Sequence, residues 1–253
     1  MMFIEAKIQL NKLKFDGKHK KVDLDELGKL FDTKCLNELN VPNPPKNDSD
    51  ITLKEVKDII KIRSNLSEFK KKAYQVTDKD PVYFIKDYMD EHGLDYSEEV
   101  MNNLMASSKH IGRHFKNKFN RPRPRQIVDA LGLDMKHFET DTTTSPSYPS
   151  NHSLQSEIVG RYYAKKHPDH AEEIMSNARI SGQGRIDAGV HYPSDDAVSM
   201  KIAEEVMFKY FKGDIEEDAP MNATGSAVST HQPVVRKKKD DKTILGLLKR
   251  NAV

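Results

Sequence analysis

The sequence predicts a mainly α protein: one compact helical domain with a small N-terminal extension and a disordered C-terminal tail. Apolar residues recur at three- and four-residue spacing along most of the chain, and strand-like alternation is almost absent after residue 40. A chain of 253 residues can bury one sizeable core but is short for two. We expect the extension over 1–40, the main helical domain over 41–212 and the tail over 213–253.

The N-terminal extension combines two patterns. Phe3, Ala6, Ile8 and Leu10 alternate as in a strand, and residues 24–31 carry a short helical pattern. The prolines within 41–45 then favour a stiff extended segment, because each proline disfavours helix in the residue before it.

The main domain begins with a capped helix. Ser49 or Asp50 suits the N-cap of a helix that continues to about Arg63. Further helical patterns follow at about 65–75, 81–91, 97–116, 153–166, 170–180 and 194–212. From Gly213 onward, acidic, small and then basic residues predict a disordered linker, with a short amphipathic helix over 243–249 that suits docking to a protein partner.

The charge balance argues against several classes of partner. The 41 basic and 39 acidic residues leave a net charge of +2, which gives no general signal for nucleic acid or anionic membranes. No apolar run approaches the roughly 20 residues that span a bilayer, and residues 1–7 lack the pattern of a secretory signal. The single cysteine, Cys35, fits a reducing compartment as an inert packed thiol. We therefore expect a cytoplasmic protein.

Three short blocks concentrate groups that handle phosphate, at residues 116–124, 149–152 and 185–195. In the third block, His191 stands at or just before a predicted helix start and Asp195 follows four residues later. The carboxylate can accept a hydrogen bond from one imidazole nitrogen, which leaves the other nitrogen free to attack. Arg185 can hold phosphate oxygens with two parallel hydrogen bonds.

The second block predicts an anion site at a helix start. Ser150 or Asn151 would begin a helix whose free backbone amides point at the anion. His152 would stand beside the phosphate, where an imidazolium can protonate a leaving alkoxide.

The first block supplies cations. Lys116 and Arg123 would stabilise the charge that phosphoryl transfer develops, without a metal. A second register, with Arg121 and Pro122 as the functional pair, is left open. His110 and His114 have a zinc-compatible spacing, but no glutamate follows His110 as in metalloproteases and no cysteine is near. We expect them in a surface or supporting role, and no metal site.

These blocks resemble the type-2 phosphatidic-acid phosphatase and vanadium haloperoxidase superfamily. Its pattern is Lys-x6-Arg-Pro, then Pro-Ser-Gly-His, then Ser-Arg-x5-His-x3-Asp. Within it, the soluble class A bacterial acid phosphatases are most similar, because they too have a proline-rich segment ahead of the core. The residues of this chain that fit the three motifs are Lys116, Arg123, Pro124, Pro149, Ser150, His152, Arg185, His191 and Asp195.

Two positions depart from that pattern. Asn151 replaces a glycine that would let the backbone approach phosphate closely and adopt positive φ, and asparagine is the least costly substitute there. Gly184 replaces the serine before Arg185. We expect both changes to affect efficiency and substrate range more than the type of reaction.

The resemblance and the residues together predict a metal-independent phosphatase that acts on phosphomonoesters or phosphoanhydrides through a phosphohistidine. The expected substrate is a small soluble phosphorylated compound; no cofactor is needed, and vanadate would inhibit. Two other functions are left open: a vanadate-dependent haloperoxidase, with His191 as the vanadate ligand, and a non-catalytic phosphate-binding or assembly protein. The sequence also leaves a homo-oligomer open.

Overall fold

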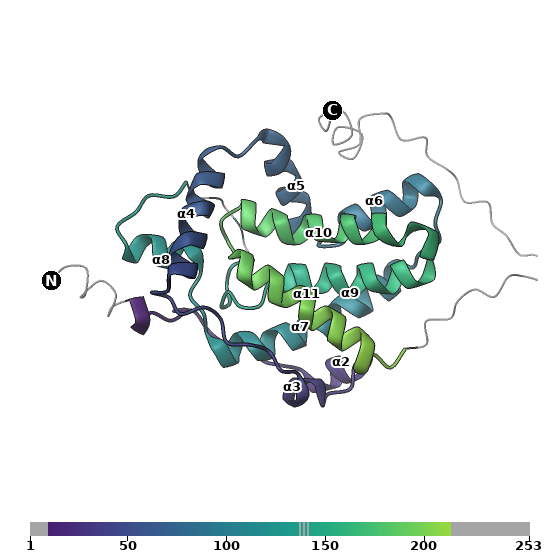
Figure 1. Cartoon of the computed structure of the whole chain (residues 1–253). Coiled ribbons are helices and arrows are strands. Elements are labelled where there is room, and N and C mark those ends of the chain that lie inside the picture. The colour runs from purple at the N-terminus through teal and green to yellow at the C-terminus, as the bar shows by residue number, and fades with distance from the viewer. Residues whose placement is uncertain (1–9, 137, 139, 141, 214–253) are drawn as a thin grey trace, which may run out of the picture.

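Helix α9 (Asn151–Lys166) is the central element of the fold, and helices α7 (Glu98–Phe119), α10 (Ala171–Asp187) and α11 (Pro193–Lys209) pack around it (Figure 1). The computed structural model describes residues 10–136, 138, 140 and 142–213. Within these residues the chain is mainly helical and has no strand, only an isolated antiparallel bridge. The predicted compact all-α domain is confirmed for this part of the chain.

The remaining helices surround this centre. Helices α5 and α6 pack on α10, whereas α2 and α3 lie against α7. Helix α4 contacts both α8 and α10 (Figure 1). Their bounds are α2 Leu24–Gly28, α3 Cys35–Glu38, α4 Asp50–Ser64, α5 Glu68–Lys79, α6 Tyr83–His92 and α8 Pro124–Ala130, with a 3₁₀ turn at Pro168–His170.

Local sequence signals explain where the helices begin and end. Ser49, Ser97 and Ser150 cap α4, α7 and α9, each accepting a hydrogen bond from the backbone amide three residues later. Helix α7 ends at Asn120, whose φ of 48° is left-handed. Pro193 occupies the first turn of α11, where its missing N–H costs nothing.

The helices predicted between residues 24 and 212 are present, with one informative difference in length. Helix α10 was expected to end near residue 180, before Gly182 and Gly184, but it continues to Asp187. Gly182 is needed for packing, because a Cβ there would lie 2.0 Å from Oδ1 of Asp196 on α11. The short helices α3 and α8 were not predicted.

Two expectations concern residues that lie mainly outside the part of the chain that the structure describes. The strand-like alternation over residues 3–10 lies outside the described residues except for Leu10, which is helical and buried. The predicted tail over 213–253, with its terminal amphipathic segment, also lies outside them except for Gly213. No described helix has the length and apolar character needed to cross a membrane.

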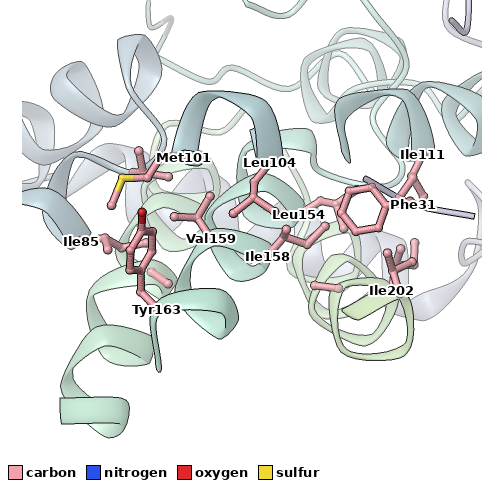
Figure 2. Close-up of a cluster of buried hydrophobic side chains, with 14 of the residues drawn as sticks. Phe31, Ile85, Met101, Leu104, Ile111, Leu154, Ile158, Val159, Tyr163 and Ile202 are labelled. Atoms are coloured by element: carbon pink, nitrogen blue, oxygen red, sulfur yellow. The ribbon is translucent and has the colours of Figure 1, made fainter. Parts of the chain in front are cut away.

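Residues of the N-terminal extension contribute to the hydrophobic core of the domain. Leu27, Phe31 and Cys35 are fully buried in the large hydrophobic cluster. Burial raises the pKa of the Cys35 thiol to about 12, which makes it unreactive. Phe31 forms the antiparallel bridge with Phe211, just after α11. Figure 2 shows Phe31 near the apolar contacts between α7, α9 and α11, made by Leu104, Ile111, Leu154, Ile158 and Ile202.

Close packing of α9 against α10 yields a first prediction. A Cβ on Gly160 would lie 2.8 Å from the Cβ of Ala178 and 3.2 Å from Sδ of Met175. Helix propensity alone would favour a larger residue by about 1 kcal/mol. We nevertheless expect Gly160→Leu to lower the free energy of unfolding by about 2 kcal/mol or more, measured by urea denaturation, because the helices must separate.

The matched control is Phe208→Ala on the exposed side of α11, where the side chain is 86% exposed. That change should alter the free energy of unfolding by no more than about 0.5 kcal/mol. Equal urea midpoints for wild type and Gly160→Leu would contradict the packing of α9 on α10.

Candidate active site

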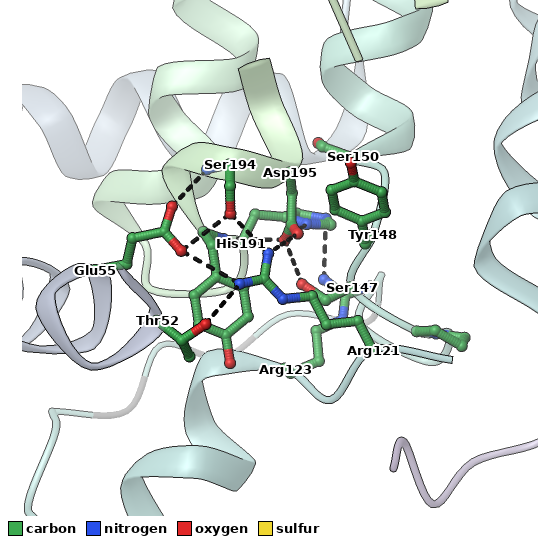
Figure 3. Close-up of polar contacts among 12 residues, drawn as sticks. Thr52, Glu55, Arg121, Arg123, Ser147, Tyr148, Ser150, His191, Ser194 and Asp195 are labelled. Atoms are coloured by element: carbon green, nitrogen blue, oxygen red, sulfur yellow. Dashed lines mark hydrogen bonds and ion pairs between the residues drawn. The ribbon is translucent and has the colours of Figure 1, made fainter. Parts of the chain in front are cut away.

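The carboxylate of Asp195, in the first turn of α11, joins the first and third sequence blocks and the loop just before the second (Figure 3). Its Oδ1 accepts a hydrogen bond from Arg121 Nη1 at 2.7 Å. Its Oδ2 accepts from His191 Nδ1 at 2.9 Å, from the Tyr192 amide at 3.0 Å and from the Ser147 hydroxyl. Burial alone would raise the pKa of Asp195, but Arg121 and these donors hold it well below its usual range. The group is therefore a fixed buried anion.

His191 lies in the turn between α10 and α11, and the surrounding groups determine its tautomer. Nδ1 donates to Asp195, so the neutral ring carries its lone pair on Nε2. Arg123 Nη1 lies 3.0 Å from that Nε2 and donates to it. Burial, and then the positive charge of Arg123, lower the pKa of His191 well below its usual value. The ring is neutral, with Nε2 directed at a cation that can also hold an anion.

The three predicted phosphate-binding cations are all buried near this point. Arg123 also donates to the carbonyls of Ser145 and Val190. Burial and the neighbouring Arg185 lower the pKa of Arg123 to about 9, so it is still a cation at neutral pH. Lys116 donates to the carbonyls of Pro146 and Ser147. Burial, and then Arg123, lower the pKa of Lys116, and a bound phosphate dianion would raise it again.

Arg185, near the end of α10, is engaged by acceptors that the sequence analysis did not single out. Its Nη1 donates to the carboxylate of Asp78 and, at 3.3 Å, to the hydroxyl of Tyr74. Its Nη2 donates to the Thr142 hydroxyl at 2.8 Å. Asp78 and Tyr74 belong to α5, about a hundred residues earlier in the sequence, so no motif spacing could have revealed them.

His152 is the second residue of α9 and lies beside Asp78, the partner of Arg185. Its Nε2 donates to the backbone carbonyl of Asp78 at 3.2 Å. Burial, and then the charge of Arg185, lower the pKa of His152 to about 3. The ring is therefore neutral in the absence of an anion.

The start of α9 is positioned as predicted, but Asn151 behaves differently from the expectation. Ser150 is the N-cap, and its amide donates to the backbone carbonyl of Asp195 at 3.3 Å. Asn151 has ordinary right-handed helical geometry, so the tolerance of asparagine for positive φ is not used here. Its side chain packs on α7, where a Cβ on Gly112 would lie 1.8 Å from Asn151 Oδ1. The residue thus fills a space that Gly112 leaves.

Gly184, the other departure, lies where α10 meets α5. A Cβ there would lie 3.3 Å from the Thr77 hydroxyl oxygen and 3.6 Å from the Tyr74 Cα. The absence of a side chain therefore brings Arg185 close to the helix that carries Tyr74 and Asp78.

The structure separates the roles of the two arginines whose register the sequence left open. Arg123 contacts His191, whereas Arg121 binds Oδ1 of Asp195, the carboxylate oxygen that His191 does not contact (Figure 3). Arg121 Nη2 also pairs with Glu55 of α4 at 3.2 Å, and its guanidinium stacks 3.8 Å from the centre of the Tyr192 ring. Glu55 in turn accepts from the amide of Ser194 at 2.7 Å. Arg121 and Glu55 thus hold the start of α11 in place.

The histidines considered for zinc lie elsewhere. His110 is buried rather than at the surface, and its Nδ1 accepts a hydrogen bond from the Asp23 amide at 2.9 Å. It supports the segment before α2. Among the described residues, no group of three or more histidine, cysteine or acidic side chains is arranged to hold a metal.

Two hollows border the candidate site. A cavity of about 200 Å³ reaches Arg123 and is also lined by Gly189 and Val190, directly before His191. A larger hollow of about 890 Å³ lies beside Tyr74 and Asp78. Lys136, Phe138 and Thr140 line both.

Comparison with known proteins gives one informative similarity. No family model matches the chain. An acid phosphatase of Zymomonas mobilis subsp. mobilis is 38% identical to it over 85 residues. The aligned region is 34% of this chain and 31% of that protein, so the chain spans about a third of the length of this relative. The similarity supports a relationship to an acid phosphatase.

The contact between Asn151 and Gly112 yields a second prediction. Gly112→Ala places a methyl group where the Asn151 amide lies, so we expect a lower free energy of unfolding. Asn151→Gly removes the obstructing side chain. The double variant should therefore recover most of the loss, with a coupling energy of at least about 1 kcal/mol in a urea-denaturation cycle. Purely additive effects of the two substitutions would contradict the contact.

Proposed function

We propose that this protein is a phosphatase that hydrolyses phosphomonoesters or phosphoanhydrides through a phosphohistidine on His191, as the type-2 phosphatidic-acid phosphatase and haloperoxidase superfamily does. The observation that carries the proposal is the buried series Arg123–His191–Asp195. An anchored carboxylate holds one imidazole nitrogen, and a guanidinium stands at the other. A nucleophile needs such an orienting group, and the phosphoryl group it attacks needs such a cation.

The reacting phosphate would bind between the cations and the start of α9. Arg123 and Lys116 supply charge on one side, and backbone amides near Ser150 and Asn151 supply donors on the other. Arg185 would exchange its contacts with Asp78 and Thr142 for phosphate oxygens. Because the three cations are buried, their attraction for an anion is screened little by water.

Two displacements complete the proposed reaction. Nε2 of His191 attacks phosphorus, the bond from phosphorus to the ester oxygen breaks, and that oxygen takes a proton from His152. Water then gives a proton to His152 and attacks the phosphohistidine, so the N–P bond breaks and inorganic phosphate leaves. Asp195 stabilises the positive charge that develops on the His191 ring. No step requires a metal.

The low pKa of His152 determines how its proton arrives. At about 3, the free protein carries a neutral His152 throughout the mildly acidic range. A phosphate monoester has a second pKa of about 6, so its monoanion can bring the proton. Once bound, the dianion opposes the charge of Arg185 and raises the pKa of His152, which then holds that proton for the leaving group.

Removal of the nucleophile gives the most direct test. His191→Ala should lower kcat on 4-nitrophenyl phosphate by about three orders of magnitude or more, because no other group can form the covalent intermediate. EDTA should leave wild-type kcat unchanged, and vanadate should compete with substrate. Rapid quenching of the wild type with ³²P-labelled ester should trap an acid-labile phosphohistidine.

The control is His92→Ala, an exposed histidine at the end of α6 that is hydrogen-bonded to the Tyr88 carbonyl. It should retain wild-type turnover. Near-normal turnover by His191→Ala would refute the mechanism. Peroxide-dependent halide oxidation after vanadate loading would favour a haloperoxidase, and tight phosphate binding without turnover would favour a non-catalytic role.

The pKa values predict an acidic optimum. With the His152 and His191 rings neutral and the substrate supplying the proton, kcat/KM for an alkyl phosphate should be highest in the mildly acidic range, below about pH 6. It should fall about tenfold per pH unit well above pH 6, as the substrate monoanion disappears. Initial rates across a constant-ionic-strength buffer series measure this profile.

The variant His152→Gln separates the acid from the nucleophile. The variant should lose much more kcat/KM on the alkyl ester than on 4-nitrophenyl phosphate, because nitrophenolate leaves without a proton. Equal losses on both esters would contradict the assignment of His152 as the acid.

A further inference from the structure

The larger of the two hollows adjoins the candidate site through Asp78 and Tyr74. Both residues line it, and both contact the guanidinium of Arg185. Its volume of about 890 Å³ is within the range of small-molecule sites. It shares Lys136, Phe138 and Thr140 with the cavity that reaches Arg123, so the two hollows lie against each other.

Positive charge dominates the lining of this hollow. Arg63, Lys71, Lys79 and Lys136 line it, against a single described carboxylate, that of Asp78, which is already paired with Arg185. Lys71 pairs with Glu68 on the exposed side of α5. Lys79 and Lys136 form no ion pair with any residue that the structure describes. Two of these cations are therefore available to an anion from solution.

Aromatic rings connect the hollow to the candidate site. The guanidinium of Arg63 lies 5.0 Å from the centre of the Phe138 ring, and Phe138 meets Tyr74 edge to face at 4.4 Å. Arg185 lies 5.2 Å from the centre of the Tyr74 ring. Arg63 is also fixed by donating to the Lys136 carbonyl at 3.0 Å. Phe138 and Tyr74 thus form a pair of aromatic rings on one side of the hollow, with a guanidinium at each end of the pair.

We infer that this hollow binds the leaving group of the substrate, and that this leaving group carries a phosphate of its own. The substrate class is then a small bisphosphorylated compound, with one phosphate at His191 and the other near Lys79 and Lys136. This inference rests on the proposed phosphatase function. A neutral or hydrophobic leaving group would leave the lysines without a counter-charge, whereas a phosphate dianion provides one.

The reaction remains an ordinary hydrolysis. The phosphate at His191 leaves as inorganic phosphate after one water is consumed. The leaving oxygen takes the proton from His152, and the product in the hollow is a monophosphate with a free hydroxyl. Loss of one of the two phosphates weakens its attraction to the site, which favours product release.

A matched pair of substrates tests the inference. Butane-1,4-diyl bisphosphate and 4-hydroxybutyl phosphate differ only in the distal phosphate. We expect the wild type to prefer the bisphosphate about tenfold or more in kcat/KM, beyond the factor of two for its two equivalent ends. The preference should shrink at 0.5 M NaCl, because exposed charges are screened.

Substitution of the lysines locates the effect. The double variant Lys79→Ala/Lys136→Ala should lower the ratio of the two kcat/KM values about fivefold or more, through KM for the bisphosphate. The matched control is Lys72→Ala. Lys72 is an exposed lysine on α5, the helix that carries Lys79, and it does not line the hollow. This control variant should leave the ratio at the wild-type value. Thermal unfolding of each variant checks that the fold is retained.

The outcomes separate the two proposals. If the wild type hydrolyses both esters in a His191-dependent way with a ratio near two, or if the double variant keeps the wild-type ratio, the inference is overturned and the proposed function stands. If neither ester is hydrolysed in a His191-dependent way, the proposed function fails, and the inference fails with it.

Discussion

The buried carboxylate of Asp195 is the group on which both the fold and the candidate site depend. A fully buried anion is costly unless donors surround it, and here a guanidinium, an imidazole, a hydroxyl and a backbone amide do so. These donors come from the loop after α7, the loop before α9 and the start of α11. Satisfying one charge therefore brings three distant segments of the chain to one point.

That same constraint fixes the chemistry of the neighbouring imidazole. Asp195 cannot turn away from His191, because Arg121 and the Tyr192 amide hold it from other sides. Arg121 is held in its turn by Glu55 of α4. The direction of His191 Nε2 is therefore determined by a helix that contributes no group to the proposed reaction. Positioning of this kind is the usual source of precision at sites that must align a nucleophile.

Much of the fold follows from local sequence signals. Serine caps, Pro193 and the apolar periodicity place most helices, since each signal acts within a few residues. The relation between His191 and Asp195 is equally local, because four residues span one helical turn. The roles of Asp78, Tyr74 and Glu55 could not be predicted, because they lie on α4 and α5 and meet the motif residues only through helix packing. Asn151 was misjudged for the same reason: its environment is made by Gly112 on another helix.

The bridge between Phe31 and Phe211 has a consequence for how the chain reaches this structure. Backbone hydrogen bonds from Asp32 to Tyr210 and from Lys212 to Leu30 join segments about 180 residues apart. A ribosome must synthesise nearly all of the described chain before these bonds can form. Contacts of such long sequence separation slow folding, so this junction forms after α2 has its partner α7. Until the end of α11 emerges, Phe31 lacks the Phe211 ring, whose centre lies 5.7 Å from its own.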